Sequence, residues 1–112
     1  MTKTLFVDTV YERTHKLATR LQEDFDSKEY RSDTVYDIKE GRKYYKIVQQ
    51  SPCGESIHSS VHAFVDKNNG NVYKPASWQK PAQHVRYNLQ DDSSYNEILS
   101  RAEWAGGYLY LR

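Results

Sequence analysis

Side chains alternate in character from residue 57 to residue 65, and this period of two determines the fold class. Odd positions carry Ile, Ser, Val, Ala and Val, whereas even positions carry His, Ser, His and Phe. Because successive side chains of a strand point to opposite faces, we predict a strand whose odd-numbered face meets a helix. Asn69 and Gly70 tolerate the positive φ of a tight turn, so residues 66–71 should connect it to a partner strand at Val72 and Tyr73.

A helical period precedes this region and predicts an amphipathic helix over residues 9–30. Thr9 and Glu12 have the spacing of a capping box at the expected helix start. The opposite side is charged, as on a solvated helix or on a helix that binds a partner. The apolar stripe consists of Val10, Leu17, Ala18, Leu21 and Phe25.

The remaining segments predict further short strands and one more helix. A hairpin is expected from alternation over residues 34–38 and 43–49 around Gly41, followed by a loop over residues 50–56 that is rich in turn-forming residues. Pro75 should end the strand that contains Tyr73. The later segments are a loop at 76–83, a strand at 85–89, a helix at 95–102 with a capping box of Ser94 and Glu97, and a final strand at 108–111.

Together these segments predict an α+β fold. A long N-terminal helix should pack on a mainly antiparallel sheet of four to six strands, with a second short helix near the C-terminus. A length of 112 residues fits a single domain over 1–112, with a helical segment at 1–31 and a sheet-rich body at 32–112. Hydrophobic residues make up only 38% of the chain and Tyr is abundant, so aromatic rings should supply much of the buried area.

Charge is segregated along the chain although the net charge is only +1. Residues 42–90 hold seven Lys or Arg against two Asp or Glu, whereas the segments before and after are each net negative. A basic middle of this kind could present a positive face to an anionic partner. The alternative is that the acidic ends fold back and neutralise it.

Catalytic and metal chemistry find little support in the sequence. His58 and His62 share a predicted strand, where positions four apart lie roughly 13 Å from each other, too far for one zinc ion. Cys53 invites a nucleophile hypothesis with one of these histidines as base, but the spacing does not ensure that the two side chains meet. We therefore expect no catalytic residue, no metal, no cofactor and no enzymatic activity.

Aromatic residues interleaved with cations form the remaining candidate site. Such residues serve as cross-strand pairs, as anchors of protein interfaces, or as stacking platforms for single-stranded nucleic acid. A protein-binding function is expected, with a nucleic-acid-binding module in segment 42–90 as the alternative, and self-association is compatible with the small apolar content. The candidate residues are Arg42, Lys43, Tyr44, Lys46, Lys74, Trp78, Lys80, Arg86 and Tyr87.

No segment approaches the roughly 20 apolar residues of a membrane helix, so no membrane association is expected. Cys53 is the single cysteine of the chain and cannot form an internal disulfide, which agrees with a reducing compartment.

Several motifs carry a resemblance to a known family: VHAFVDK at 61–67, GNVYKPASW at 70–78, PA at 81–82, VRYNL at 85–89 and WAGGYLY at 104–110. Through them the chain resembles small proteins encoded by tailed bacteriophages, over residues 43–112. The resemblance supplies no activity, ligand or catalytic residue. It implies a viral protein made in an infected bacterium and acting on a host or phage component in the cytoplasm. Small size, the absence of catalytic signatures and the abundant aromatic residues then favour a non-enzymatic accessory protein that binds a host or phage protein and could inhibit or redirect it.

Overall fold

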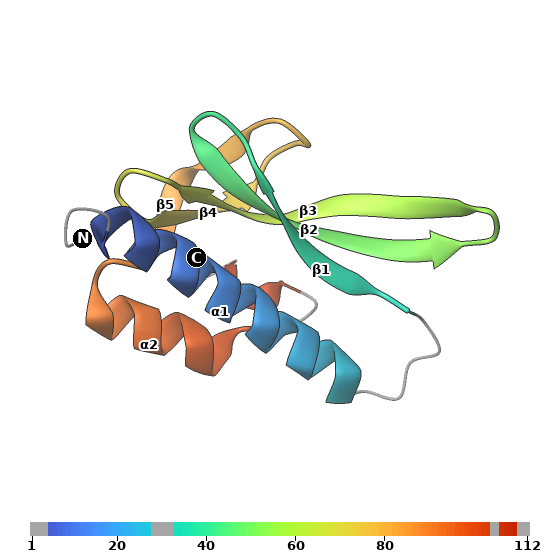
Figure 1. Ribbon diagram of the computed structural model, residues 1–112, viewed down its shortest axis with the longest axis horizontal. Coiled ribbons are helices and arrows are strands. Elements are labelled where there is room, and N and C mark those ends of the chain that lie inside the picture. The colour runs from blue at the N-terminus through green and yellow to red at the C-terminus, as the bar shows by residue number, and fades with distance from the viewer. Residues whose placement is uncertain (1–4, 28–32, 104–105, 110–112) are drawn as a thin grey trace.

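Within the described residues, the fold comprises two α-helices, five strands and one 3-10 helix (Figure 1). The computed structural model describes residues 5–27, 33–103 and 106–109. The elements in chain order are α1 (Leu5–Ser27), β1 (Val35–Glu40), β2 (Tyr44–Cys53), β3 (Ser56–Asp66), β4 (Asn71–Pro75), β5 (Pro81–Asn88), α2 (Asp92–Arg101) and η2 (Gly107–Leu109).

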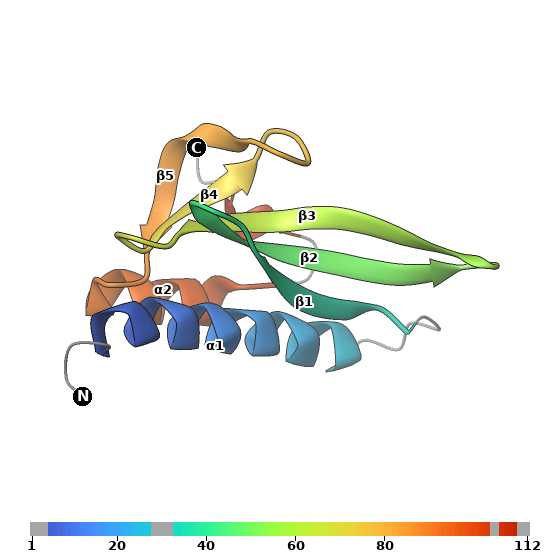
Figure 2. The same ribbon diagram turned by 45° about the horizontal axis from the view of Figure 1, so that its top comes forward.

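The strands form one sheet in the order β1-β2-β3-β4-β5, and every neighbouring pair is antiparallel. Both helices lie on one side of this sheet, as Figures 1 and 2 show. The α+β fold predicted from the sequence is therefore confirmed. Among the described residues, no helix is both long and apolar enough to cross a bilayer.

The hydrophobic core lies between α1 and the sheet. Leu17 and Leu21 of the predicted helical stripe are fully buried against Ile47 and Val65. The helix begins at Leu5, however, so Thr9 lies inside it and the predicted capping box at Thr9 is wrong. A hydroxyl three residues before a carboxylate is also compatible with a helix interior, and spacing alone does not distinguish the two positions.

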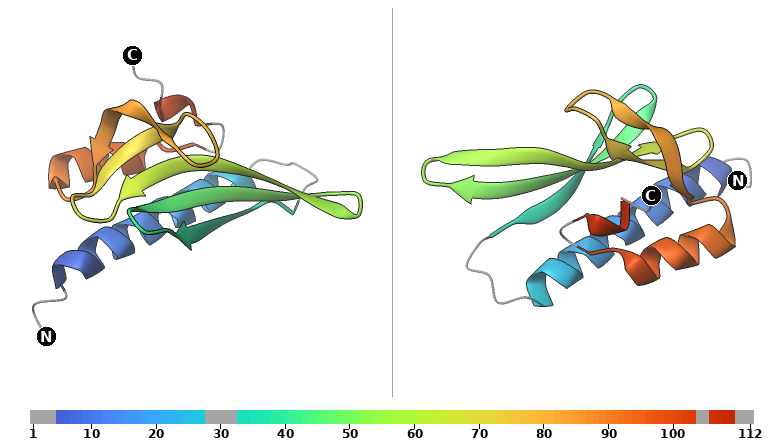
Figure 3. Two further views of the ribbon diagram at one scale, coloured as in Figure 1. Left: turned by 90° about the horizontal axis from the view of Figure 1, so that it is seen from above. Right: turned by 180° about the vertical axis from the view of Figure 1, so that it is seen from behind.

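Strands β2 and β3 form a long hairpin whose distal half projects beyond the helices (Figure 3). The loop predicted at residues 50–56 is wrong, because both strands continue to a two-residue turn in which Gly54 has a φ of +63°. Pro52 is compatible with the ladder because it pairs with Ile57 at a position where β2 and β3 need no hydrogen bond between their backbones. The hairpin predicted at 66–71 is confirmed, and Gly70 in it has a φ of +79°.

A β-bulge at His62 divides β3 into two halves with opposite facing. Ile47 of β2 pairs with Ala63, but the next residue, Val48, pairs with Val61, so His62 is the extra residue. Ala63 and Val65 face the helices as predicted. Positions 57, 59 and 61 instead share the face of Val48, so the prediction that the whole odd-numbered row meets the helix is wrong. Periodicity does not signal an inserted residue.

The C-terminal elements differ from their predicted bounds. Helix α2 begins at Asp92, and its N-cap is Asp91, whose side chain accepts from the Ser93 amide. The predicted cap Ser94 instead accepts a hydrogen bond from the Asn88 amide at 2.8 Å. The strand predicted at 108–111 is wrong where it is described, because Tyr108 and the residue after it lie in η2 and are both buried. Two adjacent buried side chains do not fit alternation; residues 110–111 lie outside the described part.

The Gln22 side chain of α1 bonds to backbone groups at the edge of β1 that is turned away from β2. Its Nε2 donates to the Thr34 carbonyl at 2.9 Å, and its Oε1 accepts from the Tyr36 amide at 2.9 Å. A side-chain amide thus satisfies two backbone groups that a further strand would otherwise pair.

Replacing Gln22 by alanine is expected to lower the free energy of unfolding by about 2 kcal/mol, because both backbone groups lose their partner. Chemical denaturation measures this change. Glu23→Ala at the neighbouring exposed position is the matched control and should leave stability within about 0.5 kcal/mol of the native value. Equal stabilities of the two variants would contradict this role of Gln22.

Candidate functional site

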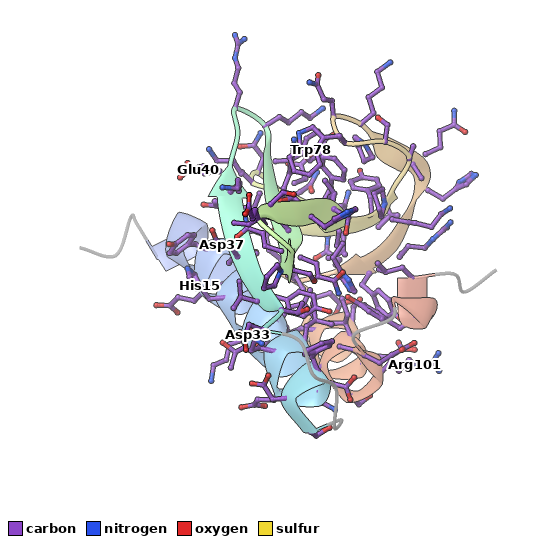
Figure 4. All side chains as sticks on the ribbon, turned by 90° about the vertical axis from the view of Figure 1, so that its right-hand side faces the viewer. His15, Asp33, Asp37, Glu40, Trp78 and Arg101 are labelled. Atoms are coloured by element: carbon purple, nitrogen blue, oxygen red, sulfur yellow. The ribbon has the colours of Figure 1, made fainter. Side chains whose placement is uncertain are left out.

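The sheet face turned away from the helices is the candidate functional site, and we call it the outer face. Figure 4 shows Trp78 on this side, away from His15 of α1 and Arg101 of α2. No described helix covers this face. Strand alternation assigns its members, since Tyr45 and Ile47 of β2 belong to the core and the even-numbered residues of that strand therefore point outward.

Exposed apolar side chains concentrate on the outer face. Val35 pairs with Gln50 and Val85 pairs with Tyr73, which places both on this side, and the bulge places Ile57 there as well. Four of the five large apolar side chains that are exposed in the described residues thus belong to the outer face or its rim; only Tyr11 lies on α1. The exposed fractions are Ile57 68%, Val35 47%, Val85 46%, Trp78 43% and Tyr11 42%.

Three rings form a small packed cluster in the middle of this face. The Tyr44 ring meets the rings of Phe64 and Tyr73 edge to face, with centroids 5.6 Å and 6.2 Å apart. Phe64 is only 1% exposed, and Val48, which points to the same face from β2, is fully buried. The outer face therefore has a buried floor, which holds the exposed rings in fixed positions.

Two lysines lie against the rings. The Lys46 ammonium is 4.8 Å from the Trp78 ring centroid and 5.8 Å from that of Phe64, and the Lys43 ammonium is 5.4 Å from that of Tyr44. Such contacts are attractive because the ring face is electronegative. They direct positive charge to the aromatic surface while the aliphatic stems cover part of it.

The structure brings four of the nine candidate residues together: Lys43, Tyr44, Lys46 and Trp78. Lys80 is exposed in the same turn as Trp78, where its amide and that of Gln79 donate to the Ser77 hydroxyl. Of two more candidates, Arg42 is exposed in the turn between β1 and β2, and Lys74 is half-buried in β4.

Arg86 and Tyr87 do not join this group, because their side chains bond to the backbone of η2. The Arg86 Nε donates to the Leu109 carbonyl at 2.7 Å, and the Tyr87 hydroxyl donates to the Tyr108 carbonyl at 3.1 Å. Tyr87 is 4% exposed. A register shift between β4 and β5 explains why Tyr87 points into the core. Tyr87 pairs with Val72 of the core, whereas Val85 pairs with Tyr73 of the outer face. These two side chains hold η2 against the sheet.

A partly buried polar contact links η2 to the bulge. The His62 Nε2 and the Tyr108 hydroxyl are hydrogen-bonded at 2.8 Å, and the Tyr36 ring meets the His62 ring edge to face at 5.6 Å. Burial lowers the pKa of His62 to about 4 and raises the pKa of Tyr108 well above its usual value. His62 is therefore neutral at physiological pH.

The two histidines that the sequence offers as a base lie in different surroundings. His62 is engaged by Tyr108, whereas His58 is exposed on the projecting hairpin. Cys53 is the last residue of β2, at the turn of that hairpin. Within the part of the chain that the structure describes, no three His, Cys, Asp or Glu side chains lie close enough to hold a metal ion.

The charge expectations are answered in part. Lys67 of the basic middle forms an ion pair with Glu40 of the acidic N-terminal part, with Nζ and Oε2 2.6 Å apart. Two further ion pairs, Arg13–Asp92 and Arg101–Glu97, lie outside residues 42–90. The acidic N-terminal part thus pairs with the basic middle at Lys67. Lys43 and Lys46 instead lie against aromatic rings.

Sequence reasoning missed Val35, Ile57 and Val85. Their facing depends on register and on two irregularities in the ladders, which no pattern of residue types reveals. It also missed a hollow of about 320 Å³ beside β3, lined by Ser59–Val61 and Pro75–Trp78. Only the unusual exposure of apolar side chains in the folded chain identifies this surface.

Comparison with known proteins gives a match by sequence family. A family model described as a family of unknown function (DUF7717) matches residues 2–111, which includes both helices and the whole sheet. No curated protein and no solved structure matches the chain.

Proposed function

The chain belongs to this family of unknown function (DUF7717), and we propose that it is a non-enzymatic binding protein whose outer face contacts another protein. The observation that carries the proposal is the concentration of exposed apolar side chains on the one sheet face that no described helix covers. The resemblance to proteins of tailed bacteriophages extends it, because the partner would then be a host or phage protein in the bacterial cytoplasm.

The chemistry of the outer face supports a protein partner. The solvated face of an antiparallel sheet is ordinarily polar, so Val35, Val85 and Trp78 are atypical there. Trp and Tyr are the side chains that most often dominate the binding energy of protein interfaces. A rigid aromatic patch beside lysines suits a partner that offers apolar groups flanked by carboxylates.

A nucleic-acid partner is supported less well by the same geometry. The face of Trp78 is approached by the Lys46 ammonium, and Tyr44 is packed edge to face between two other rings. A base would have to displace these contacts before it could stack.

Replacing Trp78 by alanine is expected to weaken partner binding about 30-fold, the loss typical of an interface hot spot. The partner is first captured from lysate of a phage-susceptible bacterium by the immobilised chain at physiological salt, and its affinity is then measured by calorimetry. Tyr11→Ala is the matched control, because Tyr11 is comparably exposed but lies on α1.

Two outcomes would overturn the proposal. One is that Trp78→Ala and Tyr11→Ala weaken binding equally. The other is tight binding of labelled single-stranded oligonucleotides that falls steeply with salt, which would favour a nucleic-acid partner.

A further inference from the structure

Strand β3 has a partner along only part of one edge. On one side β2 pairs with it from Ser56 to Asp66, whereas on the other side β4 pairs only at Phe64 and Val65. Among the strands that the structure describes, none pairs with residues 57–61 on the β4 side. This is the projecting half of the hairpin in Figure 3, where the sheet divides.

The register shows which backbone groups lie on this edge. The Tyr36 amide donates to the Gln22 side chain, so the backbone groups of Tyr36 point away from β2. Gln49 of β2 pairs with Tyr36 and therefore directs its own N–H and C=O to β3. Gln49 pairs with Ser60, whose backbone groups are therefore used within the hairpin. By alternation, the N–H and C=O of Ile57, Ser59 and Val61 point to the unpaired edge.

Apart from the bulge at His62, which adjoins Val61 at one end, this edge lacks the protection that exposed edges ordinarily have. Natural edge strands carry charges, prolines or bulges that oppose pairing with another chain. Residues 57–61 contain no Asp, Glu, Lys, Arg or Pro. Ile57 is the most exposed of the large apolar side chains in the described residues, at 68%.

Space for another strand is present beside the edge. The hollow of about 320 Å³ is lined on one side by Ser59–Val61 and on the other by Pro75–Trp78. An aliphatic side chain that approaches Val61 from outside would enter this hollow and contact Pro75 and Trp78.

We propose that a second copy of this chain pairs with β3 along this edge, antiparallel, with a two-fold axis at Ser59. In this register Ser59 lies opposite Ser59 of the second copy, and Ile57 lies opposite Val61. Each of these pairs is of the type that exchanges two hydrogen bonds, because their backbone groups point to the edge. Each Ile57 then lies at the hollow of the other copy, and the two sheets form one continuous sheet.

The edge is self-complementary, which favours a second copy over an unrelated peptide. An isologous interface requires that the same residues suit both sides. Here an aliphatic side chain meets an aliphatic side chain on the outer face, serine meets serine at the axis, and His58 meets Ser60 on the opposite face. No like charges of this segment oppose the approach, and the net charge of +1 per chain gives weak overall repulsion.

Sedimentation velocity over a range of concentrations tests the proposal, and we expect a reversible dimer. Ser59→Pro removes the central N–H and places a ring at the edge while leaving the β2 side of the ladder intact. It should raise the dimer dissociation constant at least about tenfold. Val85→Ser, which removes an exposed apolar side chain far along the sheet order, is the control and should leave the constant unchanged.

A cross-linking experiment tests the register independently of any folding defect in the proline variant. In the Cys53→Ser background, Ser59→Cys should form an intermolecular disulfide, because Cα atoms of such a pair lie about 5.5 Å apart. Ser60→Cys is the matched control: its two copies are diagonal neighbours about 7–8 Å apart and should not cross-link.

Three outcomes would overturn the inference. They are a chain that stays monomeric at all concentrations, a dimer unaffected by Ser59→Pro, and cross-linking as efficient at position 60 as at position 59. None of these outcomes contradicts partner binding by the outer face. Because Trp78 also lines the hollow that receives Ile57, the Trp78→Ala comparison of partner binding is repeated in the Ser59→Pro background, where the dimer is weakened.

Discussion

Replacing Phe64 by alanine is expected to lower the free energy of unfolding by about 4 kcal/mol, although this side chain lies on the face away from the helices. Phe64 is 1% exposed and is enclosed by Tyr44, Lys46 and the rest of the outer-face cluster. Its removal leaves a cavity that strands fixed in a ladder cannot close, and it also removes the support beneath the exposed rings.

Denaturant titration of Phe64→Ala measures this loss. Trp78→Ala is the matched control, because it also removes an aromatic ring from the outer face but from an exposed position. Its effect should stay below about 1.5 kcal/mol. A loss of less than about 1 kcal/mol in Phe64→Ala would contradict a packed floor beneath the outer face.

Acidification is expected to destabilise the protein through His62 by about 3 kcal/mol between pH 7 and pH 4. The pKa of this imidazole is about 4 in the folded chain, against 6.5 for an unperturbed histidine. The unfolded chain therefore binds a proton that the folded chain excludes in this range. Stability rises with pH from about 4 to about 6.5 and is constant above that range as far as this group is concerned.

The contribution of His62 is isolated by a difference between proteins. His62→Gln does not titrate, so the free energies of unfolding of this variant and of the native protein should converge or cross as the pH falls from 7 to 4. His58→Gln, at an exposed position in the same strand, should retain the full pH dependence of the native protein. If native protein and His62→Gln show the same pH dependence, the surroundings of His62 do not lower its pKa.

Much of the fold follows from local signals in the sequence. The stripe of α1 and the turns at Gly41 and Gly70 each depend on residues that are neighbours in the chain, and all three were predicted. The continuation of the β2–β3 hairpin through residues 50–56 was not predicted, because Pro, Gly and Ser ordinarily indicate a loop. A hairpin that places Pro52 at a pair without a hydrogen bond has the same composition.

The candidate site was less predictable because it depends on facing. Lys43, Tyr44, Lys46 and Trp78 come together as the interleaving of rings and cations suggested, yet Tyr87 of the same pattern is buried. The bulge at His62 and the register shifts of β5 decide which side chains reach the outer face. Such irregularities arise from the packing of whole strands, and no residue type specifies them locally.

The sheet consists solely of strands that pair with their neighbours in sequence, and this has a consequence for synthesis on the ribosome. Each hairpin can close soon after its second strand emerges, since only short loops separate the partners. Helix α1 emerges before the strands, but Leu17 and Leu21 find their contacts only when the strands that bear Ile47 and Val65 have followed. Helix α1 therefore presents its apolar stripe to chaperones and proteases until β3 has emerged, and the nascent chain is most vulnerable in that interval.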